Sequence, residues 1–225
     1  MNYAAFVPFK SSDWHTRLSQ VLTPEQRQKL ALYELAHVLS VLGNYAELYV
    51  GLQKNGLNET ALRTLLSQLV TDSITIISVD DVNTGIQEFY RIIGNKYEGV
   101  FICGSDLPGL KESDIQFVLG FSENVVFSSA KDGGTPFYRI SRNEKGFYVP
   151  ELYLEDGKTN TQRQIERLSE SGLSYRIVTD IPGLVRDLDT PNDIFYFLGL
   201  RNNSLPIRYL RELRNQGGFT SQNFF

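Results

Sequence analysis

Short apolar runs alternate along the chain with segments that place an apolar residue at every third or fourth position. The first run, Tyr3 to Phe9, predicts a β-strand. Residues 23–26 (TPEQ) supply a hydroxyl cap, a proline in the first turn and a glutamine three residues after the cap, a combination that predicts a helix start. Leucines then recur at gaps of three, four and three before Gly43, where we expect this helix to end: Leu32, Leu35, Leu39 and Leu42.

The same alternation continues as far as Gly134. Four further apolar runs predict buried strands: 46–52, 74–79, 99–103 and 124–129. Three segments between them predict helices: 58–70 with Asn58 as its cap, 83–94, and 113–121. Strands that are apolar on both faces and separated by helices indicate a mainly parallel sheet with helices on both sides. The expected fold class is therefore α/β, a single three-layer sandwich.

The pattern is less regular after Gly134. It predicts strands at 135–140 and 174–180, a loop at 151–158, and helices at 161–172 and 190–200. We therefore expect one domain over residues 1–200 and a C-terminal extension over residues 201–225. The extension ends in a segment with three phenylalanines, for which we expect either mobility or docking on another surface.

Composition removes several classes of protein from consideration. A net charge of −4 and a pI near 5.3 give no general attraction to nucleic acid or to an anionic membrane, so neither is an expected partner. Cys103 is the only cysteine, which excludes an intrachain disulfide and suits a reducing compartment. Apolar runs shorter than the roughly 20 residues of a membrane span, and no signal-peptide pattern, lead us to expect a cytoplasmic protein. The oligomeric state is left open, a homodimer included.

Charged residues follow three of the predicted strands. They are Lys10 and Arg17 after the first strand, Asp106 after the strand 99–103, and Asp187 and Asp189 after the last strand. In an open α/β sheet, ligands bind beyond the carboxyl ends of the strands. Carboxylates opposite a basic loop suit a Mg²⁺–nucleotide site, because Mg²⁺ prefers oxygen ligands and takes one or two protein carboxylates plus phosphate oxygens.

Each of these features also has a purely structural interpretation. Asp106 suits a turn, and residues 186–193 (RDLDTPND) suit a capped helix start. The basic residues of the opening loop are equally typical of a solvated surface. Residues 131–136 (KDGGTP) suit either a hairpin turn or a loop whose backbone N–H groups approach a phosphate.

Several motifs occur in an order and spacing that resemble a known family: VPFK, TRLSQVL, DDVN, SDLPGL, DGGT and DLDTPND. As far as about Leu200, the chain resembles the phospholactate guanylyltransferase family, CofC or FbiD, of the nucleotide-diphospho-sugar transferase-like superfamily. The resemblance implies a Rossmann-like fold of the GT-A or nucleotidyltransferase type. It also implies transfer of GMP from GTP to 2-phospho-L-lactate or phosphoenolpyruvate, with release of pyrophosphate, in the biosynthesis of coenzyme F-420. Such an acceptor is already anionic, so positioning and charge neutralisation replace a general base.

The resemblance implies a role for individual residues. The implied Mg²⁺ ligands are Asp106, Asp187 and Asp189. Lys10 and Arg17 would hold the triphosphate and the departing pyrophosphate, and with Asp106 they form the implied catalytic set. Asn83 matches a family asparagine in the nucleotide pocket. The implied acceptor-binding residues are Gly133, Gly134, Thr135, Asn160 and Thr161.

The chain departs from the family pattern at three places. Relatives usually carry lysine where His15 stands, so we expect a fixed positive charge to be replaced by a group mostly neutral at pH 7. Pro136 replaces an asparagine and removes a backbone donor, and residues 158–164 (KTNTQRQ) differ from a G.SF..H segment.

The last two departures fall in the implied acceptor pocket, so the acceptor is an open question. The alternatives are 3-phosphoglycerate or a sugar phosphate as acceptor, glycosyl transfer from a nucleotide sugar, and a catalytically silent binding relative. The choice of guanine over other bases is equally undetermined, because it depends on a few hydrogen bonds whose geometry a sequence does not show.

Overall fold

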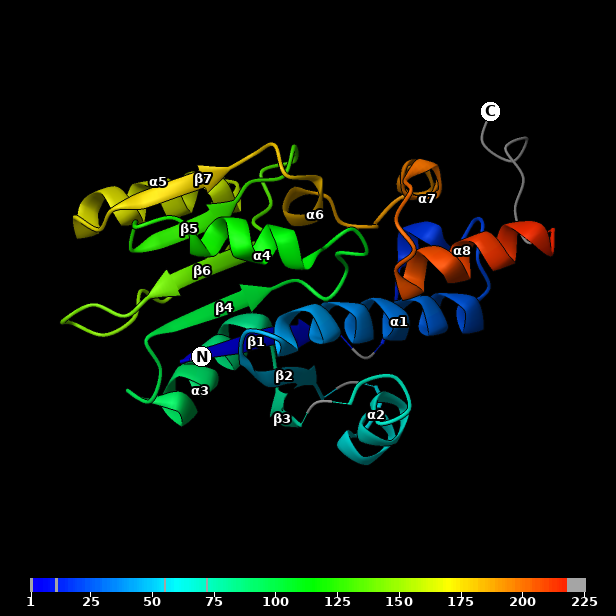
Figure 1. Cartoon of the computed structure of the whole chain (residues 1–225), viewed down its shortest axis with the longest axis horizontal. Helices are drawn as coiled ribbons and strands as arrows, with labels where there is room; N and C mark the ends of the chain where they lie inside the picture. The colour runs from blue at the N-terminus through cyan, green and yellow to red at the C-terminus, as the bar shows by residue number, and fades with distance from the viewer. Residues whose placement is uncertain (1, 11, 55, 72, 218–225) are drawn as a thin grey trace.

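A mixed β-sheet forms the centre of the molecule (Figure 1). The computed structural model describes residues 2–10, 12–54, 56–71 and 73–217. Seven strands lie in the order β3-β2-β1-β4-β6-β5-β7, and β6 runs antiparallel to both of its neighbours while the other pairs are parallel. The strands are β1 Tyr3–Phe9, β2 Glu47–Gln53, β3 Ile74–Val79, β4 Gly99–Cys103, β5 Val125–Ser128, β6 Phe137–Ser141 and β7 Tyr175–Val178. The expected mainly parallel α/β fold is confirmed.

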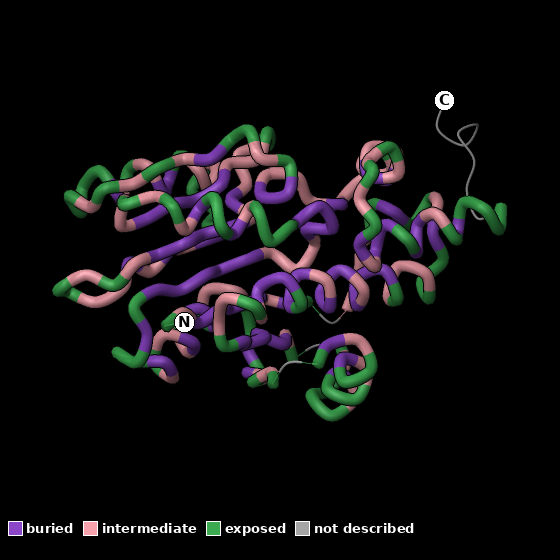
Figure 2. Tube along the Cα trace, in the orientation of Figure 1, coloured by how far each residue is buried: buried purple, intermediate pink, exposed green. Residues whose placement is uncertain are grey.

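Helices cover both faces of this sheet, so the strands between them are buried (Figure 2). One face packs against α1 (Pro24–Gly43), α2 (Glu59–Leu66), α4 (Glu112–Leu119) and α6 (Pro182–Val185), and the other against α3 (Val82–Ile93) and α5 (Asn160–Ser171). Beyond the carboxyl ends of the strands lie the 3-10 helix η1 (Thr16–Leu18), α7 (Pro191–Gly199) and α8 (Leu205–Asn215) (Figure 1). Among the described residues, no helix combines the length and the apolar character that crossing a membrane requires.

Local sequence signals start α1 and end α3 and α5 where they were predicted, whereas α2, predicted over 58–70, already ends at Leu66. Thr23 caps α1: its hydroxyl accepts from the Gln26 amide at 3.3 Å, and the Gln26 side-chain oxygen accepts from the Thr23 amide at 2.9 Å. Gly94 ends α3 and Gly172 ends α5, both with positive φ, a backbone conformation that a residue without Cβ adopts at little cost.

Two predictions about the sheet and the C-terminus were incomplete. The run 74–79, expected to be buried, forms the edge strand β3 and exposes Thr75 and Ser78. The position of a strand in the sheet depends on which strands pair with it, and the apolar pattern of a single segment does not specify its partners. Helix α8 lies within the expected C-terminal extension and was not predicted; residues 218–225 of that extension, with their phenylalanines, lie outside the described residues.

A third buried cluster joins the opening loop to the C-terminal helices. It contains Leu18 of η1, Leu188 of the segment before α7, and Leu210 of α8. Leu18 directly follows Arg17, and Leu188 lies between the two aspartates expected to bind metal. Burial of these leucines therefore holds the two charged segments against the same end of the sheet.

Truncating this cluster should destabilise the whole domain. Leu210 is fully buried, so Leu210→Ala removes buried methyl groups and leaves a cavity, which typically costs about 2–5 kcal/mol. Urea unfolding followed by circular dichroism measures the difference. Arg214→Ala, on an exposed position of the same helix, is the control and should stay within about 0.5 kcal/mol of the wild type. If Leu210→Ala also remained within that range, α8 would not be part of the folded unit.

Candidate functional site

Two acidic segments far apart in the sequence meet at the carboxyl end of the sheet. Asp106 follows β4, and Asp187 and Asp189 follow β7 and α6. The backbone amide of Leu188 donates a hydrogen bond to the carbonyl oxygen of Asp106 at 3.1 Å. The residues that flank Leu188 are therefore held next to Asp106, as the sequence motifs suggested.

The pKa values of two of these carboxyl groups reflect their burial and the negative charges around them. Desolvation, followed by the negative charge of Glu34, raises the pKa of Asp106 to about 6, against an opposing effect of His15. Desolvation, followed by the charges of Asp106 and Asp189, raises the pKa of Asp187 to about 7. A cation between the segments would relieve this repulsion. In the described part of the chain, however, no three histidine, cysteine, aspartate or glutamate side chains converge as a complete metal site.

The basic residues of the opening loop have acidic partners in this structure. Arg17 forms an ion pair with Asp189, and Lys10 Nζ lies 4.0 Å from the Asp13 carboxylate. All four side chains are substantially exposed, so these pairs are weak and can exchange partners when a phosphate binds. Arg17 thus lies at the carboxylate cluster, where the sequence placed it, with its charge already shared with a predicted metal ligand.

His15 differs from its expected state. Its Nε2 lies 2.6 Å from Glu34 Oε2, and the two side chains are only 8% and 1% exposed. Burial alone lowers the pKa of a histidine, but the charge of Glu34 and the hydrogen bond to it outweigh that effect and raise the pKa of His15 to about 9. The expectation of a mostly neutral His15 was therefore wrong, because its partner on α1 is distant in sequence.

Glu34 is a site residue that the sequence interpretation missed. Burial raises its pKa and the neighbouring His15 opposes that shift. A signal was present: Glu34 stands on the buried stripe of α1, where its neighbours at helical spacing are Ala31 and Val38. A carboxylate on an apolar helix face indicates a buried partner, although it does not say which residue that partner is.

The loop at 130–134 adopts the turn that was one of its two interpretations. The Gly133 amide donates to the Ala130 carbonyl at 3.0 Å, and the Gly134 amide donates to the Asp132 side chain at 2.9 Å. Gly133 has φ +83°, and a Cβ there would lie 2.5 Å from the Cβ of Thr159. These two amides are therefore used inside the turn and do not point freely toward an acceptor.

Three other implied contacts are also engaged within the protein. Thr135 is buried, and its hydroxyl accepts from Tyr138 at 2.7 Å. The Thr161 amide donates to the Gly133 carbonyl at 3.0 Å. The side-chain oxygen of Asn160 accepts from the Tyr153 amide at 3.0 Å. The Thr161 hydrogen bond ties α5 to the loop after β5, and the Asn160 hydrogen bond ties α5 to the loop at 151–158.

Asn83 has a partner other than a nucleotide. Its side-chain amide donates to the Leu152 carbonyl at 2.7 Å, and its side-chain oxygen accepts from the Leu152 amide at 2.8 Å. This pair of hydrogen bonds joins the start of α3 to the loop before α5. In this structure Asn83 therefore positions that loop.

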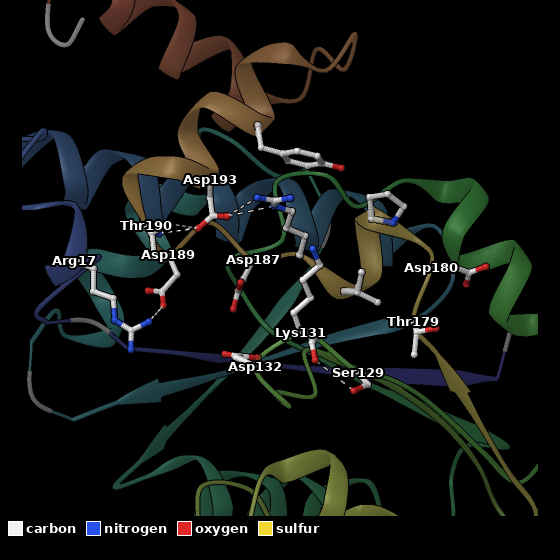
Figure 3. Close-up of a pocket in the computed structure, with 15 residues that line it drawn as sticks. Arg17, Ser129, Lys131, Asp132, Thr179, Asp180, Asp187, Asp189, Thr190 and Asp193 are labelled. Atoms are coloured by element: carbon white, nitrogen blue, oxygen red, sulfur yellow. Dashed lines mark hydrogen bonds and ion pairs between the residues drawn. The ribbon is translucent and has the colours of Figure 1, made fainter. Parts of the chain in front are cut away.

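The carboxylates separate two cavities. The smaller, about 200 Å³, lies between the opening loop and Asp106 and is lined by Lys10, His15 and Asp189 among others. The larger, about 480 Å³, lies between the loop after β5 and the helices α6 and α7 (Figure 3). Its lining combines Lys131, Arg186 and Asp187 with apolar side chains. Two cavities on either side of one acidic cluster suit a reaction that joins two substrates.

Two cations of the larger cavity were missed by the sequence interpretation. Arg186 is fixed, since it pairs with Asp193 at 3.0 Å and its guanidinium lies 3.7 Å from the ring centre of Tyr196. No hydrogen bond or ion pair links Lys131 to another residue in the described parts of the chain. Its ammonium group is therefore available to an anionic ligand.

Comparison with known proteins agrees with this geometry. Residues 3–222 match the family described as guanylyl transferase CofC like. The chain belongs to this family. Like its relatives it is an enzyme of the nucleotidyltransferase class.

Curated relatives and a solved structure support the same placement. The chain is 31% identical to the 2-phospho-L-lactate guanylyltransferase of Methanothrix thermoacetophila, over 85% of this chain and 81% of that protein. It is 26% identical to the enzyme of the same name from Methanopyrus kandleri, over 84% and 87% of the two chains. A crystal structure from Desulfovibrio desulfuricans G20, assigned as a nucleotide-diphospho-sugar transferase, superposes with a TM-score of 0.77 at 16% identity, covering 96% of each chain, and so shares the fold.

Burial of the Asp187 carboxyl group, together with the charges of Asp106 and Asp189, predicts a pH-dependent stability. Folding raises the pKa of Asp187 above its unfolded value, so the folded state favours the neutral carboxyl group. The resulting contribution to stability is fully present below about pH 4 and is lost as the pH rises through about 7. Without metal, Asp187→Asn should therefore have a higher melting temperature than the wild type at pH 8. In a domain of this size, a stabilisation of about 1 kcal/mol raises the melting temperature by about 2–4 °C. The gap should shrink at pH 4.5. Glu170→Gln, an exposed change at the far end of α5, should show no such gap, and an equal Asp187→Asn gap at both pH values would contradict the raised pKa of Asp187.

Proposed function

We propose that this protein is a Mg²⁺-dependent guanylyltransferase. It transfers GMP from GTP to a small phosphorylated carboxylic acid, 2-phospho-L-lactate or phosphoenolpyruvate, and releases pyrophosphate as a step in coenzyme F-420 biosynthesis. The observation that carries the proposal is the junction of Asp106 with the segment Asp187 to Asp189, through the hydrogen bond from Leu188, in a chain of the CofC-like family.

The donor set fits a hard divalent cation. Asp106 and Asp187 supply carboxylate oxygens at one end of the sheet, and Asp189 adjoins them. Mg²⁺ keeps several waters and takes one or two carboxylates together with phosphate oxygens, so it does not require a preformed cage of three side chains. When bound, the ion would neutralise charge on the phosphates.

The protein's own residues would position and neutralise the nucleotide. Lys10 lines the smaller cavity and Arg17 lines the larger one, each beside the carboxylates. Their side chains can therefore reach the triphosphate and the departing pyrophosphate. An oxygen of the acceptor's phosphate attacks the α-phosphorus of GTP, and the bond from that phosphorus to the bridging oxygen of pyrophosphate breaks. The nucleophile is already an anion, so the reaction needs no proton acceptor.

The larger cavity is the proposed acceptor side. It adjoins Asp187 and carries Lys131, which suits a phosphate or carboxylate. Its size also exceeds what a three-carbon acid fills, since cavities of roughly 300–1,000 Å³ hold drug-sized ligands. For that reason 3-phosphoglycerate and sugar phosphates belong in the acceptor panel beside the two favoured acids.

One assay tests donor and acceptor together. The wild type is incubated with each nucleoside triphosphate and each acceptor, pyrophosphate is measured, and mass spectrometry identifies the product. Asp106→Asn should lower the rate by about 10²-fold or more, because it removes a preorganised charge at the reacting phosphates. Glu170→Gln is the matched control and should retain activity. The proposal would be refuted if none of the acceptors in the panel supported pyrophosphate release. Full activity in a folded Asp106→Asn variant would refute it as well.

The structure predicts a small effect of placing at position 15 the lysine that relatives usually carry. His15 directs its side chain to buried Glu34 and already carries a positive charge, so His15→Lys should keep this pair and add no charge near the phosphates. The apparent KM for GTP should stay within about twofold. A several-fold fall in that KM would show instead that residue 15 contacts the triphosphate.

A further inference from the structure

The segment 186–190 carries two of the site's aspartates, and its two ends share one partner on α7. At one end, Thr190 donates from its backbone amide and its hydroxyl to Asp193 Oδ2, at 2.9 and 2.6 Å. At the other end, Arg186 donates from Nε and Nη2 to Asp193 Oδ1, at 3.2 and 3.0 Å. The Asp193 carboxylate therefore clamps both ends of the segment, with one oxygen for each end.

Further contacts hold the parts of this Asp193 clamp in place. Asp193 lies in the first turn of α7, where it forms a capping box with Thr190, and its side chain is only 15% exposed. The guanidinium group of Arg186 lies 3.7 Å from the ring centre of Tyr196, on the same helix. Charge-assisted hydrogen bonds that solvent reaches poorly are stronger than those of a surface ion pair, so the clamp is a fixed part of the site.

Leu188 anchors the middle of the segment. Its side chain is fully buried in the third apolar cluster, and its amide donates to the Asp106 carbonyl at 3.1 Å. The segment is thus held at three points, at its centre by Leu188 and at its two ends by Asp193. A short segment that is restrained at three points keeps little conformational freedom.

Asp187 and Asp189 lie between these restraints. The residues at both ends of the segment have an extended backbone, and in an extended chain successive side chains point to opposite sides. Figure 3 shows both carboxylates on the same side of the segment, directed away from Asp193. The hydrogen bonds of Asp193 go to the ends of the segment, so it acts through the backbone on the direction of both carboxylates.

We propose that Asp193 is a positioning residue, whose clamp on Arg186 and Thr190 sets the direction of the carboxylates of Asp187 and Asp189 toward a divalent ion. The inference rests on the proposed function for the ion that these carboxylates bind. Residues that hold metal ligands in place, without touching the metal, typically contribute about 10- to 100-fold to metal affinity. Metal binding by the protein is therefore the property that this clamp should control.

Two substitutions that change the charge in opposite directions test the clamp. Asp193→Asn removes a negative charge, whereas Arg186→Met removes a positive charge and can still pack on the Tyr196 ring. An effect of charge alone would weaken Mn²⁺ binding in the first variant and strengthen it in the second. The clamp predicts instead that both variants bind Mn²⁺ about tenfold more weakly than the wild type, because each substitution frees one end of the segment.

The measurement uses Mn²⁺ alone, which favours the same oxygen ligands as Mg²⁺. Electron paramagnetic resonance of the unbound ion gives the dissociation constant, well below the melting temperature of each variant, so that a loss of helix capping is not counted as a loss of metal. The double variant keeps the net charge and should bind as weakly as either single variant, because both substitutions break the same clamp. Asn192→Ala, an exposed change in the same turn of α7, is the control and should match the wild type. Asp187→Asn removes a ligand and should bind still more weakly.

Metal binding distinguishes failure of this inference from failure of the proposed function. Weaker Mn²⁺ binding in both clamp variants, without guanylyl transfer by the wild type, would support the role of Asp193 and reject the proposed reaction. Transfer by the wild type, with Mn²⁺ affinity unchanged in both variants, would reject the clamp and leave the proposed reaction standing. Tighter binding to Arg186→Met, no Mn²⁺ binding to the wild type, or binding that Asp187→Asn does not weaken would also overturn the inference.

Discussion

One backbone hydrogen bond, from the Leu188 amide to the Asp106 carbonyl, holds the site together. It joins the loop after β4 to the segment after α6, so two acidic segments far apart in the sequence are held side by side. Burial of Leu188 with Leu18 and Leu210 stabilises the junction. The charged site thus depends on an apolar cluster whose members come from both ends of the chain.

Some charges at the site are paired within the protein, while Asp106 and Asp187 lack a basic partner among the ion pairs described above. His15 pairs with Glu34, and Arg17 pairs with Asp189. Burial, followed by the charges of neighbouring carboxylates, keeps the pKa values of Asp106 and Asp187 raised. The negative charge of these carboxylates is not offset by the protein alone, and a bound divalent ion would offset it.

Much of the polar machinery that the family resemblance assigned to substrates works instead inside the protein. The Gly133 and Gly134 amides close a turn, and Asn83 and Asn160 bind backbone groups of the loop that carries Tyr153. Substrate binding either exchanges these hydrogen bonds or uses the side chains that they position. Lys131 stands out because it lines the larger cavity and no hydrogen bond or ion pair ties it to another residue in the described parts of the chain.

The sequence by itself determined the strand and helix periods, the capped start of α1 and the glycine ends of α3 and α5, because periodicity and capping act over a few neighbouring residues. It also indicated Asp106, Asp187 and Asp189 as neighbours, because parallel strands present their carboxyl ends at one edge. Only the tertiary structure decided the edge position of β3, the packing of α8, the pairing of His15 with Glu34 and the hydrogen bonds between Asn83 and Leu152. Each of these depends on contacts between segments distant in the chain, and no local pattern encodes which partner a residue will meet.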